Sequence, residues 1–239
     1  MKIALIGYGK MGQAIEAIAI QRGHEVVLKI DIGNRQDFTK QNLQKADVAI
    51  EFTSPHSAVE NILRCLEYEV PVVCGSTGWL SELPEIETAL YKYDGSFLYA
   101  SNFSLGVNIF FEVNKLLARL MAGQPAYDVE MIEVHHTQKK DAPSGTAITL
   151  AEQILDVDFH KKRWVNQDTG KKEDLYIESQ RIDPAPGTHV VIWSSDIDEI
   201  EIKHTAHSRT GFASGAVFAA EFLKGKKGIF TMKDVLGLS

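Results

Sequence analysis

The amino-terminal pattern of a short apolar strand, a glycine loop and a helix constrains the fold of this chain most. Residues 2–6 (KIALI) are apolar and lead directly into GYGKMG at residues 7–12. In this context Gly7 permits a tight turn, Gly9 lets a pyrophosphate approach the backbone, and Gly12 lets the helix pack closely on the strand. The pattern therefore predicts a strand-loop-helix unit that binds a dinucleotide.

A second strand and an acidic residue strengthen this prediction. Residues 25–30 read as a strand, and Asp31 follows Gly12 by 19 residues, near the spacing of about 20 at which an acid meets the adenosine ribose. Asp31 favours the ribose hydroxyls of NADH and repels a 2′-phosphate, but nearby basic residues could offset that repulsion. The sequence therefore leaves both NADH and NADPH open; the basic residues are Lys10, Lys29 and Arg35.

The alternation of strands and helices continues along the chain. Each further strand ends in a polar loop, and ligands of open parallel sheets bind beyond such strand ends. This predicts a Rossmann-like α/β domain. The strands are expected at residues 46–52, 70–74 and 96–100, the helices at 57–68 and 83–91, and the loops at 52–55, 74–79 and 100–104.

The pattern changes after residue 105, which predicts a second domain. Residues 106–121 are helical in pattern, residues 127–207 are strand-rich, and SSDI suggests a hairpin turn between residues 189–193 and 198–204. A final small-residue helix at 214–223 is expected to return to the first domain. We therefore expect a dinucleotide domain at 1–104 and 212–239, with an α+β domain on an open mixed sheet at 105–211 for substrate binding and oligomerisation.

Residues 135–147 (HHTQKKDAPSGTA) concentrate acid-base and anion-binding groups. They follow a strand predicted at residues 127–134 (YDVEMIEV), so His135 and His136 point in opposite directions and cannot do the same job. Ser144 is placed to cap a helix whose first N–H groups form an anion site. We favour a role of these histidines in acid-base chemistry over metal binding, because the side chains of adjacent histidines diverge and no Cys or carboxylate partner is evident at ligand spacing.

Composition excludes several other classes. A formal net charge of −7 argues against nucleic acid as a partner. The two cysteines imply no disulfide framework, and no segment reads as a membrane span or signal peptide. We therefore expect a cytoplasmic protein with neither a nucleic-acid nor a membrane partner.

Taken together, these motifs resemble the 4-hydroxy-tetrahydrodipicolinate reductase family of lysine and diaminopimelate biosynthesis. The resemblance covers nearly the whole chain and is carried by GYGKMG, EFTSP, CGSTGW, SNFSLGVN, EVHHTQKKDAPSGTA and SRTGFASGAV. It implies hydride transfer from NADH or NADPH to a cyclic dicarboxylate, no metal, and a homotetramer assembled through the sheets of the second domain.

The resemblance also implies roles for single residues. His135 would be proton donor and acceptor and Lys139 a proton donor, whereas His136, Gly145 and Thr146 would bind the substrate. The residues implied to line the cofactor are Gly7, Tyr8, Gly9, Lys10, Met11, Gly12, Asp31, Gly75, Ser76, Thr77, Ala100, Ser101, Asn102 and Phe103.

Two alternatives remain at this stage. One is another amino-acid-pathway dehydrogenase with the same two-domain plan. Residues 135–147 argue against it, because such an enzyme would need different residues in the substrate loop. The other is a non-catalytic NAD(H) sensor, which has no need of His135 and Lys139 together. Arg209 could contact substrate or cofactor, or simply begin the last helix.

Overall fold

The computed structural model describes residues 1–157, 160–208 and 210–238. The chain divides into two compact units, Met1–Leu105 with Thr210–Ser239, and Gly106–Arg209. Arg209, considered above as a ligand contact, lies outside the described residues. Among the helices that are described, none is both long and apolar enough to cross a membrane.

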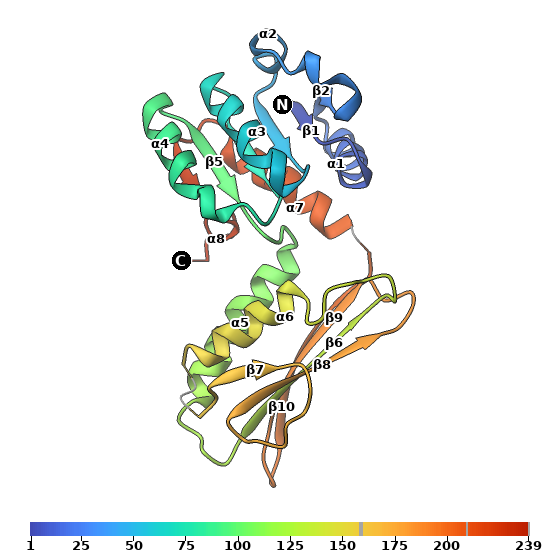
Figure 1. Ribbon diagram of the computed structural model, residues 1–239, viewed down its shortest axis with the longest axis vertical. Coiled ribbons are helices and arrows are strands. Elements are labelled where there is room, and N and C mark those ends of the chain that lie inside the picture. The colour runs from blue at the N-terminus through green and yellow to red at the C-terminus, as the bar shows by residue number, and fades with distance from the viewer. Residues whose placement is uncertain (158–159, 209, 239) are drawn as a thin grey trace. The chain divides into compact units, whose positions relative to one another are not determined.

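The first unit is built on a parallel sheet of six strands in the order β11-β5-β4-β3-β1-β2 (Figure 1). Every pairing in it is parallel, with Ile3 beside Val48 and Ile6 beside Ile30. This confirms the predicted Rossmann-like α/β class, although the edge strand β11 was not predicted. The strands are β1 Lys2–Ile6, β2 Glu25–Ile30, β3 Val48–Glu51, β4 Val72–Cys74, β5 Ser96–Tyr99 and β11 Gly228–Phe230.

Two hydrophobic cores lie on opposite faces of this sheet because side chains alternate along each strand. Ile3 and Leu5 belong to the core that contains residues of α1, α7 and α8, whereas Ala4 and Ile6 belong to the core with residues of α2, α3 and α4. The helices are α1 Lys10–Gln21, α2 Lys40–Leu43, α3 Pro55–Glu67, α4 Leu83–Tyr93, α7 Thr210–Leu223 and α8 Met232–Leu236, with 3₁₀ turns η1 Ile32–Asp37 and η2 Leu80–Glu82.

The small residues of α7 let that helix approach the sheet closely. A Cβ atom on Gly215 would stand 1.8 Å from the carbonyl oxygen of Phe103. The helix, drawn in orange in Figure 1, therefore packs on the elements formed by the first hundred residues.

The second unit is a mixed five-stranded sheet in the order β10-β9-β6-β8-β7. β9 pairs antiparallel with both β6 and β10, and β8 pairs parallel with β6 and β7, which confirms the predicted mixed sheet and hairpin. The helices α5 and α6 share one core with this sheet. The elements are α5 Leu105–Met121, β6 Asp128–His135, α6 Gly145–Leu155, β7 Arg163–Val165, β8 Asp174–Arg181, β9 Gly187–Ser194 and β10 Glu199–Ala206.

Candidate active site

The glycine loop is shaped by contacts that exclude a side chain at two positions. Gly7 has φ +94°, and a Cβ atom there would lie 2.0 Å from the carbonyl oxygen of Phe52. A Cβ on Gly12 would lie 2.2 Å from the carbonyl oxygen of Gly7. The helix α1 begins at Lys10, inside the motif, so that Gly12 packs within the first turn. Space beside Gly9 is open, as a closely approaching ligand requires.

A pocket of about 280 Å³ lies at the carboxyl ends of β1, β2 and β3. Gly7, Gly9 and Asp31 line it, as the sequence led us to expect. The sequence analysis did not assign Ser57 and Asn61, which reach it from α3. The full lining is Ile6, Gly7, Gly9, Ile30, Asp31, Ile32, Arg35, Phe52, Thr53, Ser54, Ser57 and Asn61.

Asp31 and Arg35 present opposite charges to this pocket. The Asp31 carboxylate caps η1 by accepting a hydrogen bond from the Ile32 N–H at 2.9 Å. Arg35 donates to Glu60 at 3.3 Å, and more than half of its side-chain surface is exposed. The pocket therefore offers an acceptor for ribose hydroxyls and a weakly held cation that can contact a phosphate.

Of the other residues predicted to line the cofactor, Lys10 and Met11 begin α1, whereas residues 75–77 and 100–103 lie on the loops after β4 and β5. The Thr53 N–H donates to Ser76 Oγ at 2.8 Å, and the Phe52 ring occupies the space where a Gly75 Cβ would be. The same ring lies 5.6 Å from that of Phe103. The loops after β3, β4 and β5 are thus joined beside the glycine loop. Tyr8 differs, because its hydroxyl donates to Glu16 and its ring lies under Lys29.

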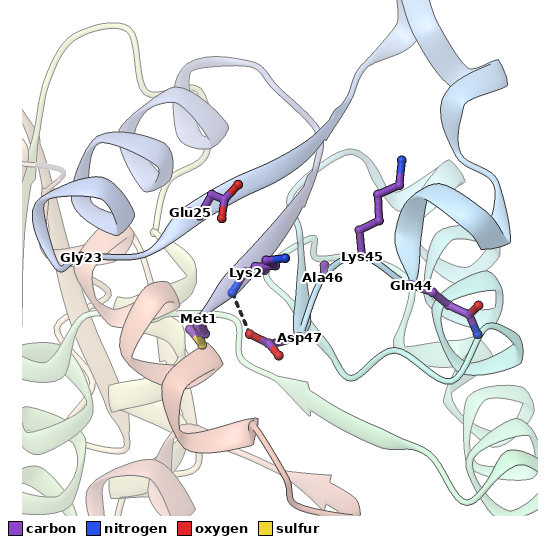
Figure 2. Close-up of a pocket in the computed structure, with 8 residues that line it drawn as sticks. All are labelled: Met1, Lys2, Gly23, Glu25, Gln44, Lys45, Ala46 and Asp47. Carbon is purple, nitrogen blue, oxygen red and sulfur yellow. Dashed lines mark hydrogen bonds between the residues drawn. The ribbon is translucent and has the colours of Figure 1, made fainter.

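A larger hollow of about 570 Å³ lies at the opposite end of the same sheet (Figure 2). Met1, Lys2, Glu25 and Asp47 surround it at the amino ends of the strands, and the Lys2 N–H donates to Asp47 at 2.7 Å. Ligands of open α/β sheets bind beyond the carboxyl ends of the strands. The smaller pocket is therefore the one that lies where such ligands bind.

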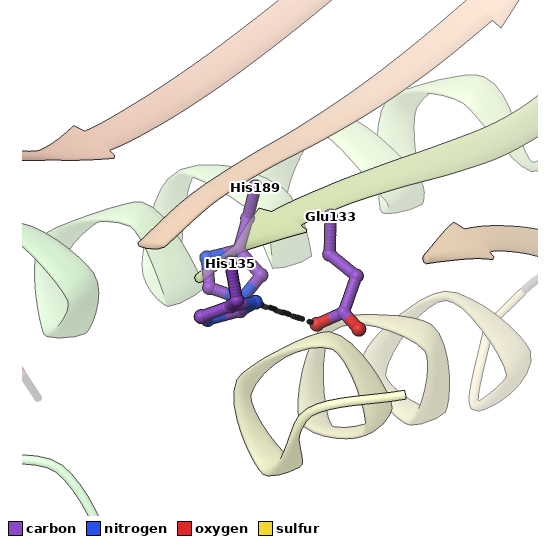
Figure 3. Close-up of side chains that lie close together, drawn as sticks. All are labelled: Glu133, His135 and His189. Carbon is purple, nitrogen blue, oxygen red and sulfur yellow. Dashed lines mark ion pairs between the residues drawn. The ribbon is translucent and has the colours of Figure 1, made fainter. Parts of the chain in front are cut away.

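In the second unit, three buried titratable side chains meet on one face of the sheet (Figure 3). Glu133 and His135 are two residues apart on β6, so they point to the same face, and Glu133 pairs across the antiparallel ladder with His189 of β9. Glu133 Oε2 lies 3.3 Å from His135 Nδ1 and 3.9 Å from His189 Nε2. The two imidazole centroids are 5.1 Å apart.

Glu133 is ionised in this cluster. Burial raises its pKa, but polar contacts with His135, Ser144 and Ser179 outweigh burial and hold the pKa well below its usual range. Its Oε1 accepts from the Arg181 guanidinium at 3.0 Å, and its Oε2 accepts from the Ser144 N–H at 3.0 Å. A fully buried carboxylate is thereby balanced by charge and hydrogen bonds.

His189 is neutral at physiological pH. Burial, with the charge of neighbouring His135 as the next cause, lowers the pKa of His189 to about 3. Its Nε2 lies 3.0 Å from Ser144 Oγ, which in turn accepts from the Ala147 N–H at 3.2 Å. Ser144 therefore caps α6 as predicted, and His189 supports the cap.

The expectation that no carboxylate lies at ligand spacing was wrong. The ligand atoms of Glu133, His135 and His189 all lie within 4.8 Å of one another. The sequence analysis missed the two partners of His135, because Glu133 lies two residues before it on the strand and His189 comes from β9. These three residues have the spacing of a metal site, but the guanidinium of Arg181 on the same carboxylate opposes a second cation.

The remaining predicted residues follow β6 along the chain, His136 and Lys139 before α6 and Gly145 and Thr146 at its start. Lys139 Nζ donates to both carboxylate oxygens of Asp141, which lowers the pKa of Asp141. Arg181 also donates to the Asp141 carbonyl oxygen at 2.7 Å, so the loop and the buried cluster are tied together. His136 follows the end of the strand and is half-buried; Gly145 and Thr146 form the first turn of α6.

Comparisons with known proteins identify relatives of both units. Residues 1–103 match the family model "Dihydrodipicolinate reductase, N-terminus", and residues 106–236 match "Dihydrodipicolinate reductase, C-terminus". The dipicolinate-bound dihydrodipicolinate reductase from Paenisporosarcina sp. TG-14 has the same fold, with a TM-score of 0.81 at 24% identity over 98% of both chains.

Curated relatives share much more of the sequence. The 4-hydroxy-tetrahydrodipicolinate reductase of Christiangramia forsetii is 51% identical over 99% of this chain and 98% of its own. The enzyme of the same name from Methanoregula boonei is 40% identical over 82% of this chain and 76% of its own. Since both family models match and together span nearly the full sequence, this chain belongs to the dihydrodipicolinate reductase family.

Proposed function

We propose that this protein is an NAD(P)H-dependent reductase that converts 4-hydroxy-tetrahydrodipicolinate to tetrahydrodipicolinate. The net reaction adds a hydride and a proton to the substrate and releases its hydroxyl group as water. The observation that carries the proposal is the buried Glu133–His135 pair, which is linked through Arg181 and Ser144 to the Lys139 loop and the start of α6. These contacts support a role for His135 and Lys139 in acid-base chemistry and for the start of α6 in binding an anion.

The substrate side of the reaction needs cations and a proton donor. When bound, a nicotinamide would supply the hydride to the conjugated ring that the substrate forms as its hydroxyl leaves as water, and negative charge would then develop on that ring. Lys139 and His135 stabilise that charge and deliver a proton to the neighbouring carbon, which is worth typically about 10²- to 10⁴-fold in rate. His136, Gly145 and Thr146 hold the substrate carboxylates.

The ion pair of Lys139 with Asp141 fits this role. The Asp141 side chain is 60% exposed, so the pair is screened and contributes little to stability. A substrate carboxylate can therefore replace Asp141 as the partner of Lys139 at small cost.

The pocket at the carboxyl ends of β1, β2 and β3 suits the adenosine half of the cofactor. Gly7, Gly9 and Gly12 shape the phosphate loop, and Asp31 accepts from the ribose hydroxyls. We propose that NADH is used and that Arg35 also permits NADPH. The nicotinamide half is assigned to the joined loops that carry Gly75, Ser76, Thr77, Ala100, Ser101, Asn102 and Phe103, with Tyr8, Lys10 and Met11 completing the glycine loop.

We also propose a cytoplasmic homotetramer assembled through the sheet of the second unit. Support comes from apolar side chains that the edge hairpin leaves exposed, namely Ile197 and Ile200. Size-exclusion chromatography with light scattering tests this assembly, and a monomer at micromolar concentration would contradict it.

The function is tested by following the oxidation of NADH and of NADPH with substrate made freshly from pyruvate and aspartate semialdehyde. Turnover that is lost in both His135→Asn and Lys139→Met supports the reductase. Tight nucleotide binding without turnover in the unaltered protein would instead identify a sensor.

A further inference from the structure

Glu133 is the buried group that the proposed mechanism does not yet use. It has no exposed surface, yet polar groups approach it from four parts of the second unit: His135 on its own strand, His189 on β9, Arg181 and Ser179 on β8, and the Ser144 N–H before α6. A carboxylate buried to this extent costs several kcal/mol of desolvation unless its partners compensate. Its position therefore needs a reason beyond packing.

The two ring nitrogens of His135 have different surroundings. Nδ1 is buried and lies at ion-pair distance from the Glu133 carboxylate, 3.3 Å from Oε2, and it has no hydrogen-bond partner among the described residues. Nε2 lies beside Gly187, where an added Cβ would stand only 3.0 Å away. A carboxylate beside Nδ1 favours a proton on that nitrogen, so that Nε2 is the nitrogen that exchanges a proton with substrate.

His189 does not compete for this carboxylate. It is neutral, and its Nε2 is directed at Ser144 Oγ at 3.0 Å, whereas the carboxylate is 3.9 Å away. Because the Ser144 hydroxyl oxygen accepts from the Ala147 N–H, its own hydrogen is available to His189 Nε2. Arg181 balances the charge of Glu133 from the side opposite His135 through the other carboxylate oxygen.

One carboxylate oxygen thus serves two purposes. Oε2 faces His135 Nδ1 and also accepts from the Ser144 N–H at the start of α6. We infer that Glu133 is a positioning residue, which fixes the tautomer and orientation of His135 and at the same time fixes the anion-binding start of α6 relative to that ring. This inference deepens the proposed reductase function and rests on it.

The first test compares Glu133→Gln, which keeps the shape but removes the charge, with Glu130→Gln, an exposed position on the same strand. We expect kcat of Glu133→Gln to fall at least about tenfold, while the KM for NADH stays within about twofold. The pH profile of kcat should also change, because the ring loses its negative neighbour while the cations of Lys139 and Arg181 stay in place.

A second test needs no variant and no turnover. The ¹⁵N chemical shifts of the His135 ring in the full-length protein, assigned with His135→Asn, report the tautomer directly. When the spectrum is recorded at a pH where the ring is neutral, a proton on Nδ1 supports the inference, and a proton on Nε2 in place of Nδ1 overturns it. If the unaltered protein turns over substrate but Glu133→Gln keeps both its kcat and its pH profile, the inference is wrong while the proposed function stands. No turnover in the unaltered protein would be a failure of the function itself.

Discussion

Lys139 and Asp141 are joined by a two-point contact, in which Lys139 Nζ lies 2.9 Å from Oδ1 and 2.8 Å from Oδ2 of Asp141. The proposed proton donor is thus held by an exposed carboxylate that belongs to its own loop. Because this ion pair is exposed, a carboxylate of the substrate can replace Asp141 as the partner of Lys139, as a site for a dicarboxylate requires.

Releasing Lys139 should therefore improve substrate binding. In Asp141→Asn we expect the KM for the dicarboxylate to fall about two- to fivefold, with kcat within about twofold, because a repelling charge is removed and no reacting group is lost. Steady-state kinetics measures both values. A higher KM would mean that Asp141 orients Lys139 for the substrate instead of competing with it.

Removing either acid-base group should abolish turnover without affecting cofactor binding. We expect His135→Asn and Lys139→Met each to lower kcat by about 10²- to 10⁴-fold, since each removes a proton donor. Nucleotide affinity, measured by fluorescence titration, should be unchanged. Lys140→Met, at the exposed neighbouring lysine, is the matched control and should retain nearly full activity.

Two substitutions in the glycine loop should separate an effect on folding stability from an effect on nucleotide binding. Gly12→Ala places a Cβ 2.2 Å from the Gly7 carbonyl oxygen and should cost about 1–3 kcal/mol of stability as well as affinity for NADH. Gly9→Ala meets no protein atom within 4 Å and should weaken NADH binding while leaving the urea midpoint unchanged. Equal losses of stability in the two variants would contradict this distinction.

Arg35 should distinguish the two nucleotides. Its contact with Glu60 is long and exposed, so the guanidinium is available at the pocket that also contains Asp31. In Arg35→Gln we expect the KM for NADPH to rise about tenfold and that for NADH to change less than twofold, because only NADPH carries a 2′-phosphate. A similar rise for both nucleotides would show a general contribution to binding.

His189 should make the protein sensitive to acid. Its pKa is lowered to about 3 in the folded state from an ordinary 6.5, so that below about pH 6.5 the unfolded chain binds a proton that the folded chain does not. Folding stability is therefore lost as the pH falls from about 6.5 towards 3, by at most about 1.4 kcal/mol per pH unit.

Urea unfolding of His189→Gln between about pH 7 and pH 5 tests this dependence. The variant should lose less stability than the unaltered protein over this range. His56→Gln, at an exposed histidine, should follow the unaltered protein. Parallel curves for His189→Gln and the unaltered protein would show that His189 titrates normally.

Local patterns along the chain were sufficient to predict most of the fold. An apolar strand, or a helix capped by Ser144, is specified by residues within a few positions of one another. Propensity and periodicity therefore predict where such elements lie. The short edge strand β11 was missed, because a strand of three residues has too little periodicity to recognise. Strand ends also shifted: β6 extends to His135 and thereby holds that ring in the sheet.

The sequence by itself determined the dinucleotide motif, the acid-base segment and the family to which they belong. Only the tertiary structure decided what surrounds His135. Glu133 lies on the same face as His135 because the two are separated by the two-residue period of the strand. His189 and Arg181 contact Glu133 from β9 and β8, and both lie more than forty residues further along the chain. Such contacts depend on strand pairing and register, which no local pattern specifies, and they set the charge and orientation of the site.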